Sequence, residues 1–230
     1  MIRGILFDFN GTLFFDSKMH ILAFRRLFEE YNLPVLSDDE IVHSIFGRTN
    51  ITIFREKFKP DASMEEAMAF SDKKEALYRE ICLADPACMK LVDGAEEMLS
   101  ELKSRNVPFC LATGSPKDNL DFYVEHLGLG RWFGAGNTVY DDRSFPGKPA
   151  PDIYRIAAGR IGISPEEALV LEDGTSGMLS ALRAGVGAIV PIWEENLPSP
   201  LSEAVSPVGK DGRIYHDLKN WREILAHYGI

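Results

Sequence analysis

Hydrophobic and polar positions between residues 15 and 85 follow the period of helices rather than that of strands. From Asp16 or Ser17, either of which suits a helix N-cap, apolar side chains recur at helical spacing until Leu33-Pro34 ends the pattern. No stretch of this region alternates as a half-buried strand would. Further helices are predicted at residues 38–46, 49–58 and 64–83. The pattern therefore predicts an all-helical region.

The remainder of the chain alternates between short apolar runs and helical periods. Residues 2–9 form the first apolar run, and after Asp85-Pro86 the two patterns take turns. Strands are predicted at 107–116, 168–171 and 186–192, and helices at 94–105, 116–127, 152–161, 176–184 and from 215 onward. The stretch 134–152, rich in Gly, Asp and Pro, is predicted as a loop, and 194–213 carries no assignable pattern.

Strands that alternate with helices indicate a parallel α/β sheet. We therefore predict an α/β core made of residues 1–14 and 91–230, interrupted after its first strand by a helical domain over 15–90. The expected hinges between the two domains are residues 13–16 and 84–93.

Composition and charge limit the classes of function that the chain can have. Apolar content of 45% suffices for a buried core, and 25 basic against 35 acidic residues argues against a nucleic-acid partner. The three cysteines form no CxxC pair, which disfavours zinc sites and disulfide scaffolds and favours a reducing compartment. No apolar run is long enough for a membrane span or a signal peptide. We expect a cytoplasmic monomer without a membrane partner.

Polar clusters fall where predicted strands end or where a loop precedes a helix. They are Asp8 after the first strand, Thr113, Gly114 and Ser115 after FCLA, Lys148 in the GKPAPD loop, and Glu172 and Asp173 after ALVL. Because ligands bind at the carboxyl ends of the strands in open parallel sheets, we expect these side chains to share one site.

The residue types in these clusters suit phosphoryl transfer. Asp8 can act as a nucleophile, and Mg²⁺ held by Asp8, Glu172 and Asp173 would offset the repulsion between a carboxylate and a phosphate dianion. The Thr113 hydroxyl and the backbone N–H after it can hold two phosphate oxygens, and the Lys148 ammonium can balance their charge. Each feature alone has a structural explanation: a turn aspartate, a helix N-cap, a surface lysine and an acidic loop pair. Their succession at strand ends favours the functional interpretation.

The residues resemble those of the haloacid dehalogenase superfamily. The matching segments, in chain order, are FDFNGTL, LATGS, GKPAPDIY and LVLEDGTSGMLSALRAG. The resemblance covers nearly the whole chain and implies a Rossmann-like core with an inserted helical cap. It also implies Mg²⁺ as cofactor and hydrolysis of a small phosphorylated metabolite through an aspartyl-phosphate.

The resemblance also assigns roles to individual residues. It implies that Asp8 is the nucleophile, that Thr113 binds phosphate and that Lys148 stabilises it. Glu172 and Asp173 would hold the metal together with Asp8 and the backbone carbonyl of Asn10.

Within the superfamily, the chain is most similar to β-phosphoglucomutase and related phosphosugar phosphatases. Three cap residues match positions that contact substrate in those enzymes: His20 in the first cap helix, Arg48 in FGRT and Lys74 in DKKEALY. The alternative for His20 is a helix-surface histidine. The alternative for Lys74 is a solvated lysine like its neighbour Lys73.

The chain departs from the family's phosphatases at Asn10, where those enzymes carry an aspartate that protonates the leaving group and then activates water. An amide does neither, and general acid–base catalysis typically contributes about 10²–10⁴-fold.

Three hypotheses follow from Asn10. The protein is a phosphatase or mutase-like enzyme that tolerates the amide, with another group such as His20 moving the proton. Alternatively, it is a phosphate-ester binding module with weak or no turnover. In the third hypothesis, Asn10-Gly11 deamidates and restores an aspartate in part of the population.

Overall fold

The structure is a computed structural model that describes all residues except 47, 196, 198–200, 202, 206–207 and 209–212. The chain divides into two compact units. The core unit comprises Met1–Phe15 and Lys90–Ile230, and the helical unit comprises Asp16–Met89.

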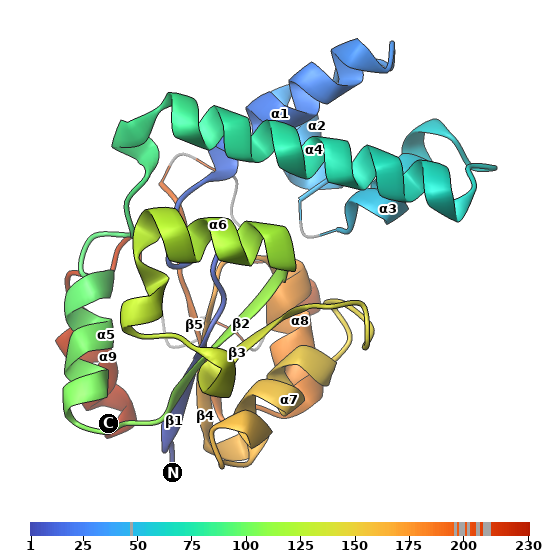
Figure 1. Cartoon of the computed structure of the whole chain (residues 1–230). Coiled ribbons are helices and arrows are strands. Elements are labelled where there is room, and N and C mark those ends of the chain that lie inside the picture. The colour runs from blue at the N-terminus through green and yellow to red at the C-terminus, as the bar shows by residue number, and fades with distance from the viewer. Residues whose placement is uncertain (47, 196, 198–200, 202, 206–207, 209–212) are drawn as a thin grey trace. The chain divides into compact units, whose positions relative to one another are not determined.

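The core unit is built on a five-stranded parallel sheet (Figure 1), which confirms the predicted fold class. Its strands are β1 (Gly4–Phe7), β2 (Phe109–Pro116), β3 (Thr138–Asp141), β4 (Ala168–Glu172) and β5 (Ala188–Pro191). The strand order is β3-β2-β1-β4-β5, so β1 lies at the centre. All four residues of β1 are buried, as an apolar run without alternation predicts for a central parallel strand.

The register of the sheet fixes which residues leave it together. Phe7 of β1 pairs with Leu111 of β2 and with Leu171 of β4. The residues that follow these three therefore emerge at the same edge, and the backbone N–H of Asp8 donates to the carbonyl of Leu171 at 3.0 Å.

Helices cover both faces of the sheet. They are α5 (Ala95–Ser104), α6 (Lys117–Leu127), α7 (Asp152–Arg160), α8 (Thr175–Ala184) and α9 (Trp221–Tyr228). α5 and α9 lie on one side of the sheet and α7 and α8 on the other (Figure 1). Leu6, Cys110 and Val170 of the three central strands belong to the same buried cluster as Tyr154 and Ala157 of α7. This packing holds the loop before α7 near the ends of the central strands.

The sequence missed one strand and misjudged several boundaries. The predicted loop 134–152 is wrong at Thr138–Asp141, which forms the edge strand β3 beside β2. Four residues are too few to show a period, and only two of them are buried. The predicted closing helix begins at Trp221 rather than at residue 215, where Tyr215 instead bridges to Ile192.

The helical unit contains α1 (Ser17–Glu30), α2 (Asp38–Ser44), α3 (Asn50–Ile53), a π-helical turn (Phe54–Phe58) and α4 (Met64–Ala84). α1 packs along α4. Ser37 and Ser63 open α2 and α4 with capping boxes. No strand occurs in the described part of this unit, as predicted, but the helix expected over 49–58 changes from α to π at Phe54.

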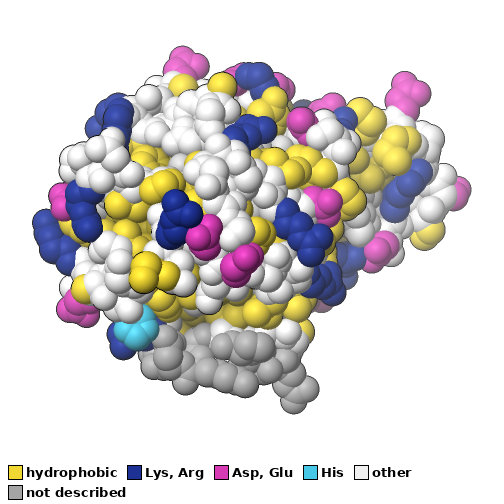
Figure 2. Space-filling model, turned by 90° about the horizontal axis from the view of Figure 1, so that it is seen from below, with side chains coloured by type: hydrophobic (Ala, Val, Ile, Leu, Met, Phe, Trp, Pro, Cys, Tyr) yellow, Lys and Arg dark blue, Asp and Glu magenta, His cyan; other side chains and the backbone are white. Residues whose placement is uncertain are grey.

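None of the described helices has both the length and the apolar character that a bilayer span requires. On the face of the molecule shown in Figure 2, both basic and acidic side chains lie among apolar and neutral ones.

Candidate active site

The turn after β1 lies beside the end of β4, at the carboxyl edge of the sheet. Gly11 has φ +78°, and a Cβ at this position would lie 2.1 Å from an Asp173 carboxylate oxygen. Only glycine fits both the backbone and the space. Thr12 then donates from its hydroxyl to Asp173 Oδ1 at 3.1 Å, which ties this turn to the end of β4.

Lys148 joins the ends of β1 and β4. Its Nζ donates to Asp8 Oδ1 and to Glu172 Oε1, both at 2.6 Å. Burial by itself would lower the pKa of Lys148, but the Asp8 and Glu172 carboxylates outweigh it and raise that pKa above its ordinary value. Lys148 therefore stays charged, with its ammonium directed at the Asp8 carboxylate.

Burial and neighbouring charges shift the pKa of both aspartates at the site. Burial raises its pKa to about 7, although the positive charge of Lys148 opposes the shift. Burial and the charges of Glu172 and Asp8 also raise the pKa of Asp173 well above its usual range. In the absence of further positive charge, both carboxyl groups hold their protons more tightly than exposed aspartates do.

Glu172 is oriented by three donors. Lys148 and the Tyr154 hydroxyl, at 3.1 Å, donate to Oε1, and the backbone N–H of Gly174 donates to Oε2 at 2.7 Å. A Cβ at Gly177 would lie 1.4 Å from Glu172 Oε1, so the start of α8 approaches this carboxylate as closely as a glycine allows.

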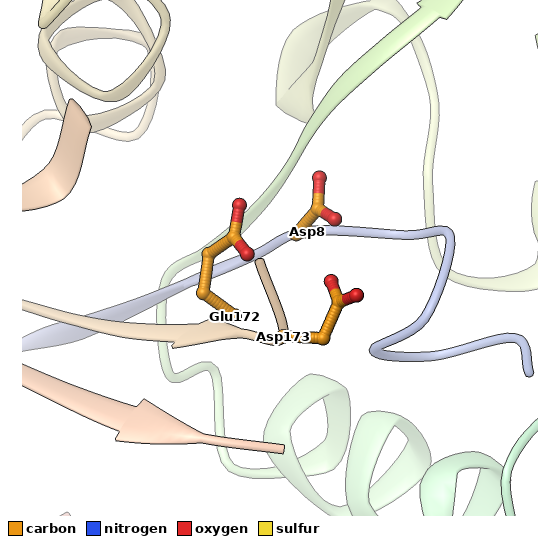
Figure 3. Close-up of side chains that lie close together, drawn as sticks. All are labelled: Asp8, Glu172 and Asp173. Carbon is orange, nitrogen blue, oxygen red and sulfur yellow. The ribbon is translucent and has the colours of Figure 1, made fainter. Parts of the chain in front are cut away.

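Asp8, Glu172 and Asp173 form a cluster that can hold a metal ion (Figure 3). Each offers a carboxylate oxygen, and the three atoms lie within 4.8 Å of one another. With all three ionised beside the Lys148 ammonium, two negative charges remain uncompensated. A hard divalent cation that prefers oxygen ligands fits both the donor set and this charge.

The residues after FCLA lie beside the same edge. Thr113 is buried, and its hydroxyl oxygen accepts from the backbone N–H of Ser115 at 3.1 Å. Gly114 is exposed, and a Cβ there would meet no atom of the described chain within 4 Å. The Ser115 hydroxyl donates to Asn10 Oδ1 at 2.7 Å. The backbone at Gly114 is thus open to a ligand, whereas the Ser115 hydroxyl is engaged by Asn10.

Asn10 is bonded on both ends of its amide. Besides the bond from Ser115, its Nδ2 donates to the Tyr123 hydroxyl of α6 at 2.8 Å. The backbone N–H of Gly11 donates to the carbonyl of Phe14 at 2.7 Å. Deamidation requires this nitrogen to attack the Asn10 side chain, so the hydrogen bond acts against the reaction.

The helical unit brings two of its three predicted residues together. Lys74 Nζ lies 2.7 Å from His20 Nδ1 and 3.0 Å from Glu75 Oε1. With 3% exposure, Lys74 is not the solvated lysine of the alternative interpretation. His20 stacks on Tyr78 at 4.2 Å between ring centroids, and its Nε2 lies 3.2 Å from an Asp16 carboxylate oxygen.

Arg48 does not belong to that pair. Its guanidinium forms an ion pair with Glu56 and donates to the backbone carbonyl of Ser44 at 3.3 Å.

Sequence reasoning missed Thr12, Tyr123 and Tyr154, all of which bond to predicted site residues. Thr12 could have been found, since it follows the turn glycine of FDFNGTL. The two tyrosines reach the site through the packing of α6 and α7, which no local pattern encodes.

Known proteins share the sequence pattern of this chain. The family model of haloacid dehalogenase-like hydrolases matches residues 2–185. A phosphorylated carbohydrates phosphatase of Thermotoga maritima is 27% identical over 190 residues, which cover 82% of this chain and 84% of that protein.

The solved structures that this chain resembles include two that match over its whole length. A haloacid dehalogenase hydrolase of Entamoeba histolytica, family IA, variant 3, matches with TM-score 0.85 and 31% identity over 100% of both chains. A β-phosphoglucomutase of Clostridium difficile matches with TM-score 0.77 and 18% identity over 100% of this chain and 98% of its own, a likeness of fold alone.

Proposed function

Because the chain belongs to the family of haloacid dehalogenase-like hydrolases, we propose that it hydrolyses the phosphate ester of a small phosphorylated sugar. The observation that carries the proposal is the contact of Asp8 with Lys148 at 2.6 Å, beside the carboxylates of Glu172 and Asp173. A nucleophile, a buried cation and an acid pair at one sheet edge are what phosphoryl transfer requires. The name of the T. maritima relative supports the class of substrate.

Asp8 performs the chemical step in this proposal. One of its carboxylate oxygens bonds to phosphorus while the bond from phosphorus to the ester oxygen breaks, and the leaving oxygen takes up a proton. Water then attacks phosphorus in the aspartyl-phosphate, gives up a proton, releases phosphate and restores the Asp8 carboxylate. Lys148, the Thr113 hydroxyl and the backbone at Gly114 hold the non-bridging phosphate oxygens, where negative charge resides.

Mg²⁺ is the proposed cofactor, held by Asp8, Glu172, Asp173 and the backbone carbonyl of Asn10. When bound, it would polarise a phosphate oxygen and neutralise the carboxylates that otherwise repel the substrate. Because burial raises the pKa of both Asp8 and Asp173, the cation would also favour the ionised form that Asp8 needs as a nucleophile.

Asn10 sets the rate in this proposal. Its amide can bond to the leaving oxygen but cannot transfer a proton, so hydrolysis of the aspartyl-phosphate becomes the slow step. The same residue favours a second candidate, a binding module that recognises phosphorylated sugars and turns them over weakly or not at all. A third outcome is transfer of the phosphoryl group to a second sugar, as in a phosphoglucomutase.

The cap residues remain proposed substrate contacts. We assign His20 and Lys74 to one polar cluster that meets the sugar, with His20 as a candidate to move the proton that Asn10 cannot. Arg48 is proposed to bind a distal anionic group, in exchange for its ion pair with Glu56.

A panel of sugar phosphates and aryl phosphates, assayed with Mg²⁺ for phosphate release, tests the proposal. Wild type should release phosphate from some members of the panel, and Asp8→Ala should not. No release above Asp8→Ala, together with a sugar phosphate that raises the melting temperature, would instead identify the binding module.

The Asn10→Asp variant in the same panel separates the candidates. A large gain of activity shows that the amide had suppressed turnover, whereas a loss shows that wild-type chemistry depends on it. Release of a phosphorylated product isomer, with little free phosphate, would identify the transferase. An intact mass equal to the encoded mass in an active sample excludes deamidation of Asn10 as the source of activity.

A further inference from the structure

One hydrogen-bonded chain in the core unit is not used by the reaction as proposed above. It runs from the Ser115 hydroxyl to Asn10 Oδ1 at 2.7 Å and from Asn10 Nδ2 to the Tyr123 hydroxyl at 2.8 Å. Ser115 lies at the end of β2 and Tyr123 lies on α6, so two separate elements form hydrogen bonds with the Asn10 amide. Both lengths are those of well-formed bonds.

Tyr123 is a rigid support for this chain. Its side chain is fully buried, with its ring 4.5 Å from the ring of Phe9 and 6.0 Å from that of Phe14 between centroids. Phe9 and Phe14 bound the turn that contains Asn10, and their own rings lie 5.8 Å apart. The phenol thus packs against both ends of the turn while its hydroxyl reaches the residue between them.

We propose that Tyr123 and Ser115 are positioning residues that hold the side chain of residue 10 in one place for the reaction, an inference that rests on the proposed function. Both partners are hydroxyls, and a hydroxyl can donate or accept. The pair can therefore hold an amide, as here, or a carboxylate that accepts two hydrogen bonds. The same support would keep the side chain of Asn10→Asp where the amide now lies, without a buried unsatisfied atom.

The arrangement also gives Ser115 a role other than binding substrate. Its hydroxyl donates to Asn10, and its backbone N–H donates to Thr113 Oγ1. Loss of the Ser115 hydroxyl should therefore lower the single-turnover rate of Asp8 phosphorylation through Asn10 and leave the substrate Kd unchanged, whereas loss of a phosphate ligand would raise that Kd.

A double-mutant cycle on the single-turnover rate of Asp8 phosphorylation tests the proposal, because the Asn10 amide meets the leaving oxygen in that step. Tyr123→Phe removes the hydroxyl but keeps the ring that packs on Phe9 and Phe14. In the wild-type background, we expect Tyr123→Phe and Ser115→Ala each to lower this rate about tenfold, the value of one good hydrogen bond. In an Asn10→Ala background, neither should have a further effect. Equal fold-losses in both backgrounds, or a change in substrate Kd alone, would overturn the proposal.

A second readout is independent of turnover. The side-chain NH₂ resonances of Asn10, assigned by their loss in Asn10→Ala, should exchange slowly with solvent in wild-type protein and faster in Tyr123→Phe. Tyr31→Phe, which deletes a hydroxyl in the helical unit, should leave them unchanged. If wild type releases no phosphate, the proposed function fails, and these resonances still decide the positioning. Unaltered exchange in Tyr123→Phe would contradict it.

Discussion

The two units each contain a buried lysine, and the two lysines have similar surroundings. Lys148 of the core unit donates to Asp8 and Glu172 and lies 5.1 Å from the ring centroid of Tyr154. Lys74 of the helical unit contacts His20 and Glu75 and lies 5.1 Å from the ring centroid of Phe24. A buried ammonium in either place needs two polar partners and gains from an aromatic face.

The lysines differ in what surrounds their partners. Around Lys148, three carboxylates crowd one sheet edge and exceed the positive charge, so the cluster favours a divalent cation and a phosphate. Around Lys74, the Glu75 carboxylate pairs with the ammonium and accepts a further bond from Asn50 at 2.7 Å. The lysine of the core unit belongs to the proposed reaction site, where charge is dense, whereas the lysine of the helical unit links α4 to α1 through His20.

The largest effect should come from the core lysine. Lys148→Met leaves the Asp8 and Glu172 carboxylates without their common donor and removes the charge that would face phosphate. We expect kcat for phosphate release to fall about 10³-fold. Steady-state assays with Mg²⁺ at fixed pH measure this, and circular dichroism checks the fold. Activity within tenfold of wild type would separate Lys148 from the reaction.

The cap lysine should affect stability more than the neighbouring lysine does. Lys74→Met leaves the Glu75 carboxylate buried without its cation, so we expect about 3 kcal/mol lower free energy of unfolding. Lys73 is the matched control, because it is exposed and pairs across the surface with Glu30. Lys73→Met should change stability by about 0.5 kcal/mol or less. Equal effects in urea unfolding would show that Lys74 is solvated after all.

Two glycine-to-alanine substitutions in helices of the core unit test how closely α8 approaches Glu172. Gly177→Ala forces Glu172 to move, since a Cβ would lie 1.4 Å from its carboxylate, and should lower stability by about 2 kcal/mol. Gly159 in α7 has no described atom within 4 Å of its Cβ position, so Gly159→Ala should raise stability by about 0.5 kcal/mol. Thermal unfolding of both variants gives the comparison. Two changes of the same sign would contradict the close approach of α8 to Glu172.

How far the sequence could predict the molecule differs between the units. In the core unit, Asp8, Glu172 and Asp173 come together because the register of β1 and β4 fixes their positions, and strand ends can be located from an apolar run. The sequence therefore predicted all three members of that cluster, and their roles remain proposals.

In the helical unit, whether Lys74 or Lys73 faces inward depends on how α4 rotates against α1. Both lysines are compatible with a helix, and only tertiary packing distinguishes them. Tertiary packing also brings the Tyr123 hydroxyl to Asn10 from the neighbouring helix, so the sequence did not predict this contact. Strand β3 was missed because its edge position leaves two of its residues half-buried.

The smallest predicted effect concerns pH. Burial raises the pKa of Asp8 to about 7, so between about pH 4 and pH 7 the folded protein keeps a proton that the unfolded chain has released. The contribution of Asp8 to the stability of the metal-free protein therefore falls as pH rises through this window. Mg²⁺ competes with that proton, so it should bind about tenfold more weakly at pH 6 than at pH 8.

Thermal shifts at subsaturating Mg²⁺, with EDTA as reference, measure this competition. Asp8→Asn removes one titrating ligand and should weaken this pH dependence, with Asp173, whose pKa is also raised, retaining part of it. A wild-type shift that is equal at the two pH values, or larger at pH 6, would contradict the assignment of Asp8 as a metal ligand.

The covalent state of Asp8 during turnover tests the proposed reaction most directly. Wild-type protein would be mixed with an aryl phosphate or sugar phosphate and Mg²⁺, quenched in acid within one turnover, and analysed by intact mass and peptide mapping. Because Asn10 cannot activate water, we predict that a phosphoryl group accumulates on the peptide containing Asp8 and is absent from Asp8→Asn. A phosphoryl group on a different residue, or undiminished phosphate release by Asp8→Asn, would contradict the account.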